Sequence, residues 1–288
     1  METFMIKRKG YDQVCHIQKK SYKEDEIVYI TFPGLEKTGC VKHLFSTRIG
    51  GGSRGMFSSM NLSYTRGDEK EAVDENYRRI AACLESDVSC FVCSDQTHTD
   101  NIRIVGPQDM GKGTIYPKDY HDVDGLITNQ RGIVLGTFFA DCVPLFFVDP
   151  VKKAIGMTHS GWRGTVQKIG KKTVRMMQEQ YGSNPADMYT AIGPSICQSC
   201  YEVSGDVIDR VKEAFPESLW SDLFYPTIPG KYQLNLWEAN RQIMLEAGIL
   251  AEHIEVTDIC TCCNPDFLFS HRASQGKRGN LGAFLALI

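Results

Sequence analysis

The sequence predicts an α+β protein with layered sheets rather than a doubly wound parallel sheet. Stretches rich in β-branched and aromatic residues follow one another along the chain, and the helical segments between them do not alternate regularly with the strands. Apolar residues make up 42% of the chain, which is enough for a sizeable core, and no Pro/Ser-rich linker divides it. One domain spanning residues 1–288 is therefore the simplest account, with residues 1–25 as a polar N-terminal extension.

The first strands are expected at 27–35 and 40–48, because both segments combine β-branched and aromatic residues. A helix is expected at 67–84, where Asp68 supplies a cap and acidic residues follow in the first turn. A second helix, at about 165–181, places its apolar residues on one face. The remaining segments predict strands near 90–93, 101–106, 124–128, 133–139, 143–149, 153–158, 188–193, 254–258 and 281–287, and helices near 204–215 and 233–247.

Charge and hydropathy exclude two classes of partner. The net charge is −3, and no cluster of Lys and Arg is interleaved with aromatic residues, so neither nucleic acid nor an anionic membrane is an expected partner. The longest apolar stretch, 133–148, is broken by Asp141 and is better explained as two strands than as a membrane span. The N-terminus has no apolar segment typical of a signal peptide, so we expect a cytoplasmic protein.

Eleven cysteines are many for a chain of this kind. An odd number cannot pair completely within one molecule, and a reducing compartment is expected in the absence of a signal peptide. A ribbon-type zinc site would need two C-x-x-C pairs brought together, and the first two pairs lie more than a hundred residues apart. Reduced thiols packed as small hydrophobic groups are therefore favoured, although the second pair could still lie near a functional site. The clusters are Cys90 with Cys93, Cys197 with Cys200, and Cys260 with Cys262 and Cys263.

A cysteine and two histidines are the main candidates for chemistry. Cys142 and His159 fall at the ends of predicted strands, and His98 lies upstream in the segment SDQTHTDNI. Three nitrogen and sulfur ligands with a fourth position open are typical of a catalytic zinc site. The separations of 44 and 17 residues match no compact zinc finger. A buried free cysteine with two hydrogen-bonded histidines therefore remains the alternative.

Eight short segments occur in one order from about residue 40 to the C-terminus. They are FSTRIGGGS (45–53), SSMNLS (58–63), QTHTDNI, VDGLIT (123–128), ADCVP, HSGWRGT, AIGPSIC with YEV (191–203), and FSHRASQGKRGNLGAFLAL (269–287).

In this order the segments resemble the YfiH family, also known as laccase-domain proteins, multicopper polyphenol oxidases, peptidoglycan editing factors or purine nucleoside phosphorylases. The resemblance implies a layered α/β/β/α sandwich with mixed sheets, a cysteine-hydrolase-like fold over residues 1–288. It also implies a zinc site on His98, Cys142 and His159, activity on purine nucleosides, and a monomer or homodimer.

Several polar residues could assist such a site. Asp141, Asp124 and Asp100 lie at or near strand ends or close to His98, where a carboxylate could orient a metal-bound histidine or carry a proton. Each of the three could equally be a turn or capping residue.

Four further residues are candidates for binding substrate or phosphate. Arg48 precedes three glycines whose amides could approach an anion, although a flexible hairpin loop would use the same glycines. Arg163 stands just before a predicted helix, whose N-terminus favours anions, and Arg278 could line the same pocket. Asn61 could bind a ligand or hold a turn.

Two metal-dependent alternatives are disfavoured. A laccase of the multicopper kind needs about ten histidines for its copper centres, and this chain has seven. Copper could use the ligand set of His98, Cys142 and His159, but one chain could not build the trinuclear cluster. A cytidine-deaminase site needs H-x-E followed by P-C-x-x-C, whereas here His98 precedes Thr99 and Asp100, and Cys197 follows Ile196.

The serious rival is an amide hydrolase that edits peptidoglycan precursors, by zinc or by a Cys142–His159 thiolate–imidazolium pair. A non-enzymatic binding protein is disfavoured by the polar residues at the strand ends. The favoured hypothesis is a zinc-dependent purine nucleoside phosphorylase, of the adenosine, inosine, guanosine and methylthioadenosine class, with adenosine deaminase activity. Its substrates would be a purine nucleoside and phosphate. The preferred nucleoside and the balance of the two reactions stay open.

Overall fold

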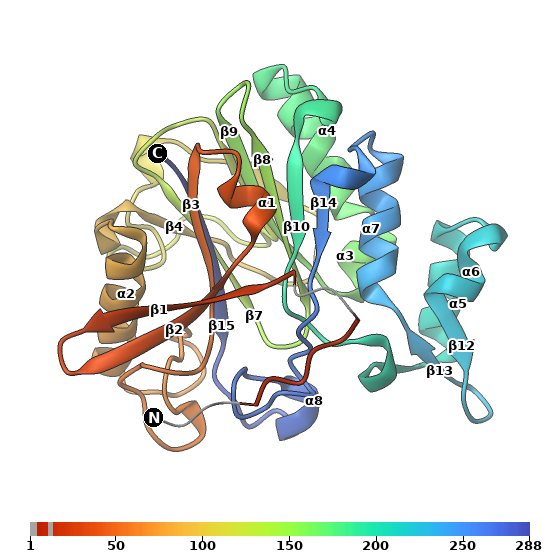
Figure 1. Ribbon diagram of the computed structural model, residues 1–288, viewed down its shortest axis with the longest axis horizontal. Helices are drawn as coiled ribbons and strands as arrows, with labels where there is room; N and C mark the ends of the chain where they lie inside the picture. Colours follow the sequence, from red (N-terminus) through yellow and green to blue (C-terminus); the bar gives the residue numbers. More distant parts are fainter. Residues whose placement is uncertain (1–4, 11–13) are drawn as a thin grey trace.

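Two six-stranded sheets stack face to face, and helices cover their outer faces. The computed structural model describes residues 5–10 and 14–288. In Figure 1, helix α2 (Lys70–Leu84) lies against one sheet on the left, and helices α4 (Ile169–Tyr181) and α7 (Leu236–Glu246) lie to the right of the other. Both sheets contain parallel and antiparallel pairs. The prediction of an α+β sandwich with mixed sheets in α/β/β/α layers is confirmed.

The first sheet combines strands from the two ends of the sequence. The C-terminal strand pairs antiparallel with two neighbours in the middle of this sheet, and its seven residues are all buried. The strand order is β1 (His16–Tyr22), β2 (Asp25–Thr31), β3 (Val41–Ser46), β15 (Leu281–Leu287), β7 (Val134–Phe139) and β4 (Phe91–Cys93).

Strand β1 corrects the prediction of a polar extension over residues 1–25. Residues His16–Tyr22 pair in full register with β2 and form the edge of the sheet. The side chains of β1 are exposed or half-buried, so the strand needs no run of apolar residues. An edge strand of this kind carries little hydrophobic signal, which explains why the sequence pattern missed it.

The second sheet carries His159, at the end of one of its central strands. Its central strands, β8 and β9, pair antiparallel along seven residues each and are completely buried. The order is β14 (Ile254–Val256), β10 (Tyr189–Ile192), β8 (Val143–Asp149), β9 (Ala154–Ser160), β6 (Gly125–Thr128) and β5 (Ile102–Ile104).

Side chains alternate along β8 between two separate cores. Phe146 and Val148 contribute to the core between the sheets, whereas Leu145 and Phe147 pack under the helices of the outer face. Successive residues of a strand point to opposite faces, so a sheet covered on both sides needs a continuous apolar strand. This is why the run 143–149 shows no polar alternation.

The helices differ from the prediction in their ends. The expected helix 165–181 is two helices, α3 (Trp162–Val166) and α4, because Lys168 between them has a left-handed backbone with φ of 57°. Helix α2 begins at Lys70, and Asp68 does not cap it: its carboxylate accepts hydrogen bonds from Glu69 N and from the amide of Asn61.

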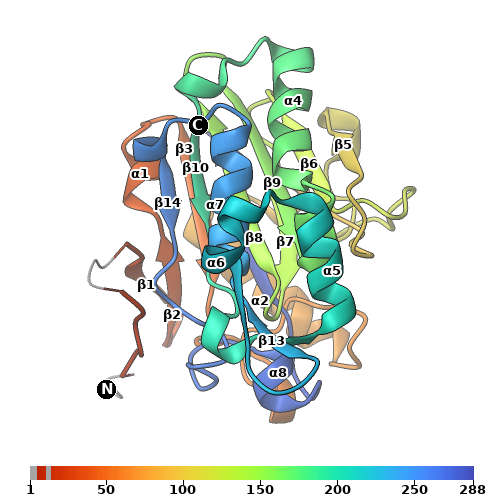
Figure 2. The same ribbon diagram turned by 90° about the vertical axis from the view of Figure 1, so that its right-hand side faces the viewer.

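A small lobe adds a third sheet that the sequence pattern did not reveal. Figure 2 shows its helices α5 and α6 on the same side of the molecule as α4 and α7. The expected helix 233–247 is a strand followed by α7, and the strands of the lobe are only three or four residues long. The lobe consists of β11 (Glu202–Ser204), α5 (Gly205–Ala214), α6 (Trp220–Leu223), β12 (Phe224–Pro226) and β13 (Lys231–Leu234); the remaining short helices are α1 (Pro33–Glu36) and α8 (His271–Ser274).

Within residues 5–10 and 14–288, none of the helices combines the length and the hydrophobicity that a bilayer span requires.

Candidate metal and catalytic site

The site lies where the chain passes from one sheet to the other. Cys142 belongs to the short turn that leads from β7, in the first sheet, to β8, in the second. His98 belongs to the loop that makes the same passage between β4 and β5. His159 is on β9, directly opposite Pro144 of β8. The three side chains therefore come from two segments that cross between the sheets and from the end of strand β9.

The structure brings these three side chains together. One ligand atom from each of His98, Cys142 and His159 lies within 4.8 Å of the others. The Cys142 Sγ is 3.8 Å from His98 Nε2, and the two imidazole rings meet edge to face at 4.8 Å between centroids. His159 is buried, Cys142 is half-buried and His98 is exposed, so the group opens toward solvent on one side.

Asp124 holds both histidines in place. Its carboxylate is fully buried, and its Oδ1 lies 2.8 Å from His159 Nδ1. The backbone amide of His98 donates to the same oxygen at 3.1 Å, and Thr97 and Thr99 donate to the other. Because the carboxylate accepts at Nδ1, neutral His159 carries its proton there and presents the lone pair of Nε2 to a metal ion.

The electrostatics of the group favour the charged forms. Burial acts to raise the pKa of the Cys142 thiol. The charge of His159 and the hydrogen bonds to His159 and His98 outweigh burial and lower this pKa to about 6. Burial lowers the pKa of His159, whereas the charge of Cys142 and the hydrogen bond to Asp124 raise it to about 9. Burial acts to raise the pKa of Asp124. The hydrogen bonds from His159 and Thr99, together with the charge of His159, outweigh burial and lower this pKa.

The donor set fits a zinc ion. Two imidazole nitrogens and one thiolate, with a carboxylate on the far nitrogen of His159, are the ligands and support that catalytic zinc uses. Gly161 leaves room beside the group, because a Cβ there would lie 3.0 Å from His98 Cδ2 and 3.1 Å from Cys142 Sγ. These residues would hold the ion beside the adjoining cavity, where it would supply Lewis-acid chemistry.

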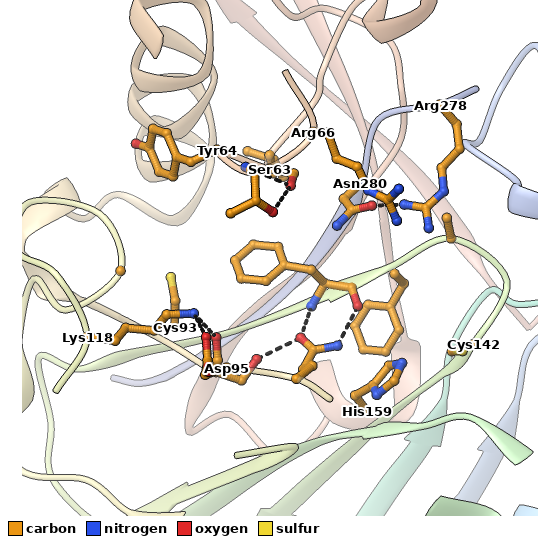
Figure 3. Close-up of a pocket in the computed structure, with 18 of the residues that line it drawn as sticks. Ser63, Tyr64, Arg66, Cys93, Asp95, Lys118, Cys142, His159, Arg278 and Asn280 are labelled. Carbon is orange, nitrogen blue, oxygen red and sulfur yellow. Dashed lines mark hydrogen bonds and ion pairs between the residues drawn. The ribbon is translucent and has the colours of Figure 1, made fainter. Parts of the chain in front are cut away.

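A cavity of about 330 Å³ adjoins the three ligands. This volume is in the range of small-molecule sites. Figure 3 shows Arg66, Asn280 and Arg278 together on one wall, with Cys142 and His159 at the same end and Lys118 and Asp95 at the other. Aromatic residues on the remaining walls are Tyr64, Tyr77, Phe138 and Phe139.

Two guanidinium groups give this cavity a positive wall. Arg278 was expected from the sequence to line the pocket, and the structure places it there. Burial and the nearby charge of Arg66 lower the pKa of Arg278 to about 10. Asn280 accepts a hydrogen bond from Arg278 and orients it. Like charges held this close favour an anion between them.

The structure corrects the expectation for Arg48. Its guanidinium donates to the carbonyls of Ser58 at 2.8 Å and Pro265 at 2.7 Å, and it does not line the cavity. The glycines beside it serve packing: a Cβ on Gly51 would lie 2.1 Å from the Ser59 carbonyl oxygen. Arg48 therefore joins two loops instead of binding phosphate.

Asn61 holds a turn, which was the alternative to ligand binding. It is buried, and its amide contacts Ser63 and the backbone of Asn280, both of which line the cavity. Arg163 stacks over Trp162 and lines a separate hollow with Arg210, so it is not at the cavity.

Asp141 and Asp100 are also away from the reacting groups. The carboxylate of Asp141 accepts from Thr261 Oγ1 at 2.6 Å and from Arg272 N at 2.7 Å, and it does not line the cavity. Asp141 therefore fixes the turn before Cys142. Asp100 pairs with Lys172.

Sequence reasoning missed several residues that line the cavity. Arg66 lies in a polar stretch before α2 with no motif around it. Lys118 and Gln96 come from long loops, and Gln96 is fixed by two hydrogen bonds to the backbone of Phe138. Two of these residues carried a signal: Gln96 begins the segment QTHTDNI, and Asn280 lies in the C-terminal segment that contains Arg278.

Known proteins resemble this chain over most of its length. The family model described as multi-copper polyphenol oxidoreductase laccase matches residues 42–288. The purine nucleoside phosphorylase YlmD of Bacillus subtilis is 41% identical over 248 residues, which are 84% of this chain and 87% of that protein. The adenosine deaminase RL5, from an unknown prokaryotic organism, is 32% identical over 76% of this chain and 83% of its own.

A solved structure shares the fold. The crystal structure of the Bacillus licheniformis hypothetical protein YfiH superposes with a TM-score of 0.84 at 35% identity, covering 90% of this chain and 96% of that one. From the family match, the relatives and this shared fold, the chain belongs to the YfiH family of laccase-domain proteins.

Proposed function

We propose that this protein is a zinc-dependent purine nucleoside phosphorylase that also deaminates adenosine. The observation that carries the proposal is that two groups of residues line one cavity. The His98–Cys142–His159 group lies at one end, and the Arg66–Arg278 pair lies on the wall beside it. Relatives named for each of the two activities support the substrate class. A zinc ion held by the three ligands would supply a Lewis acid able to activate water or polarise the purine.

The protein residues divide the remaining tasks. Arg278 and Arg66 bind phosphate and place one of its oxygens for attack on C1′ of the ribose. The C1′–N9 bond then breaks, and the purine leaves with the bonding electrons and takes up the proton that the attacking hydrogen phosphate gives up. Phe138 and Tyr64 offer aromatic faces against which the base can pack. Asp124 keeps the proton of His159 on Nδ1 throughout.

Incubation of the purified protein with adenosine, with and without phosphate, tests the proposal. Chromatography should show adenine and ribose 1-phosphate when phosphate is present, and slow formation of inosine in its absence. Cys142→Ala should abolish both reactions. Adenosine that remains intact under both conditions, in a protein with a full zinc site, would contradict the proposal.

A second candidate function rests on the order Cys142, His159, Asp124. A thiol, an imidazole beside it and a carboxylate behind the imidazole are also the arrangement of a cysteine hydrolase. Such an enzyme would cleave an amide of a peptidoglycan precursor. A chelator that removes zinc would leave this activity intact, whereas it would stop the nucleoside reactions.

A further inference from the structure

Four other cysteines come together outside the cavity. Cys197 and Cys200 follow β10, and Cys260 and Cys263 follow β14. Strands β10 and β14 are parallel neighbours, and the bridge between Ser195 and Cys260 continues that pairing beyond their ends. Two C-x-x-C segments that are far apart in sequence therefore follow the C-terminal ends of neighbouring parallel strands and lie side by side.

The distances between the sulfurs match a single tetrahedral ion. All four Sγ atoms lie within 4.8 Å of one another. Cys200 and Cys263 are 3.4 Å apart, and Cys197 and Cys263 are 3.9 Å apart. A tetrahedron with Zn–S distances of about 2.3 Å has edges of about 3.8 Å. The four thiols are free cysteines, so no disulfide occupies the group.

Two backbone amides point at one of these sulfurs. The N–H groups of Cys197 and Cys263 both donate to Cys260 Sγ, at 3.2 and 3.4 Å. Hydrogen bonds of this kind stabilise a thiolate ligand and fix its direction. Two backbone amides therefore point at this buried sulfur, whereas a cysteine packed only as a small hydrophobic group would need no such donors.

We propose that Cys197, Cys200, Cys260 and Cys263 bind a second zinc ion, separate from the one at the cavity. All four positions are filled by protein sulfurs, which is typical of a structural site. Tetrahedral thiolate sites take zinc or iron, and clusters of several irons spread their cysteines over different metal atoms. The short sulfur–sulfur distances favour one ion.

This second ion would hold the turn that carries Cys142. Thr261, within the second C-x-x-C segment, donates its hydroxyl to Asp141 at 2.6 Å. Ile196, next to the first segment, donates its amide to the Asp141 carbonyl at 3.0 Å. Asp141 has a strained backbone with φ of 92° and directly precedes Cys142. The four-cysteine site would therefore be a support for the cavity, with no contact to substrate.

The test measures zinc per chain in full-length protein purified without added metal. The parent should contain two zinc ions, and both His98→Ala and Cys263→Ser should contain one. The combined variant should contain almost none. The matched control is Cys262→Ser, since Cys262 is adjacent in sequence but is not among the four sulfurs; it should keep both ions.

X-ray absorption on His98→Ala makes the test independent of whether Cys263→Ser folds. Its zinc edge should show only sulfur neighbours, at about 2.3 Å. The proposal is overturned if His98→Ala contains no zinc, if its zinc has nitrogen or oxygen neighbours, or if mass spectrometry finds the four cysteines as disulfides. A parent with one zinc that His98→Ala retains would support this site while contradicting zinc at the cavity.

Discussion

Replacing Asp124 by Asn should disable the cavity site while leaving the fold recognisable. Five donors converge on the two carboxylate oxygens: three backbone amides, the Thr99 hydroxyl and His159 Nδ1. Each oxygen accepts at least two of them, so an amide nitrogen in either position leaves at least two donors without an acceptor. At about 1.5–3 kcal/mol for each hydrogen bond to a charged group, stability should fall by roughly 3–6 kcal/mol.

The same substitution should also weaken metal binding. His159 would lose the partner that fixes its tautomer, and the loop bearing His98 would lose its anchor, so zinc affinity should fall by about ten- to a hundredfold. Denaturant unfolding and competition with a chelator measure the two quantities. The control is Asp122→Asn, an exposed carboxylate on the same segment that binds only the Thr97 hydroxyl with its side chain. Equal behaviour of the two variants would refute the reasoning.

Three further predictions follow from single contacts. Gly161→Ala should weaken zinc binding because its Cβ would press on His98 and Cys142, whereas Gly205→Ala, with no neighbour closer than 3.9 Å, should bind normally in the same chelator assay. Arg278→Ala should raise the half-saturating phosphate concentration about ten- to a hundredfold in phosphorolysis kinetics, and Arg163→Ala should leave it unchanged. Burial lowers the pKa of His43 to about 3, so the unfolded chain binds the extra proton and stability should fall by about 1.4 kcal/mol per pH unit as pH drops below about 6.5. His43→Gln should remove that part of the slope in unfolding measured from pH 7 to 4, and an unchanged slope would contradict it.

The sequence pattern predicted the parts of the fold that bury apolar side chains. The runs 133–139 and 143–149 became β7 and β8 with ends shifted by at most one residue. Strand β1 was missed because an edge strand can be polar, and the break at Lys168 was missed because a left-handed lysine leaves no pattern.

The site was predictable to the extent that its residues stand at strand ends. His98, Cys142 and His159 were recognised, and the structure brings their ligand atoms together. Arg48 was expected to bind phosphate because it stands beside glycines, yet a Cβ on Gly50 or Gly51 would collide with backbone atoms, so these two glycines serve close packing. Arg66 was not considered, because no motif surrounds it. The four-cysteine group was discounted because spacing was compared between the wrong pairs: Cys197 and Cys200 meet the third cluster through the parallel pairing of β10 and β14, which only the topology reveals.

The position of the three candidate ligands, where the chain crosses from one sheet to the other, also has a mechanical consequence. Among the described residues, no strand of one sheet is hydrogen-bonded to a strand of the other, so the layers are held together by side-chain packing and by the loops that cross between them. An ion bound to His98, Cys142 and His159 would tie two of these crossings to β9. The metal would thus hold the two layers in register, and its loss would loosen the molecule first at the end that holds the cavity.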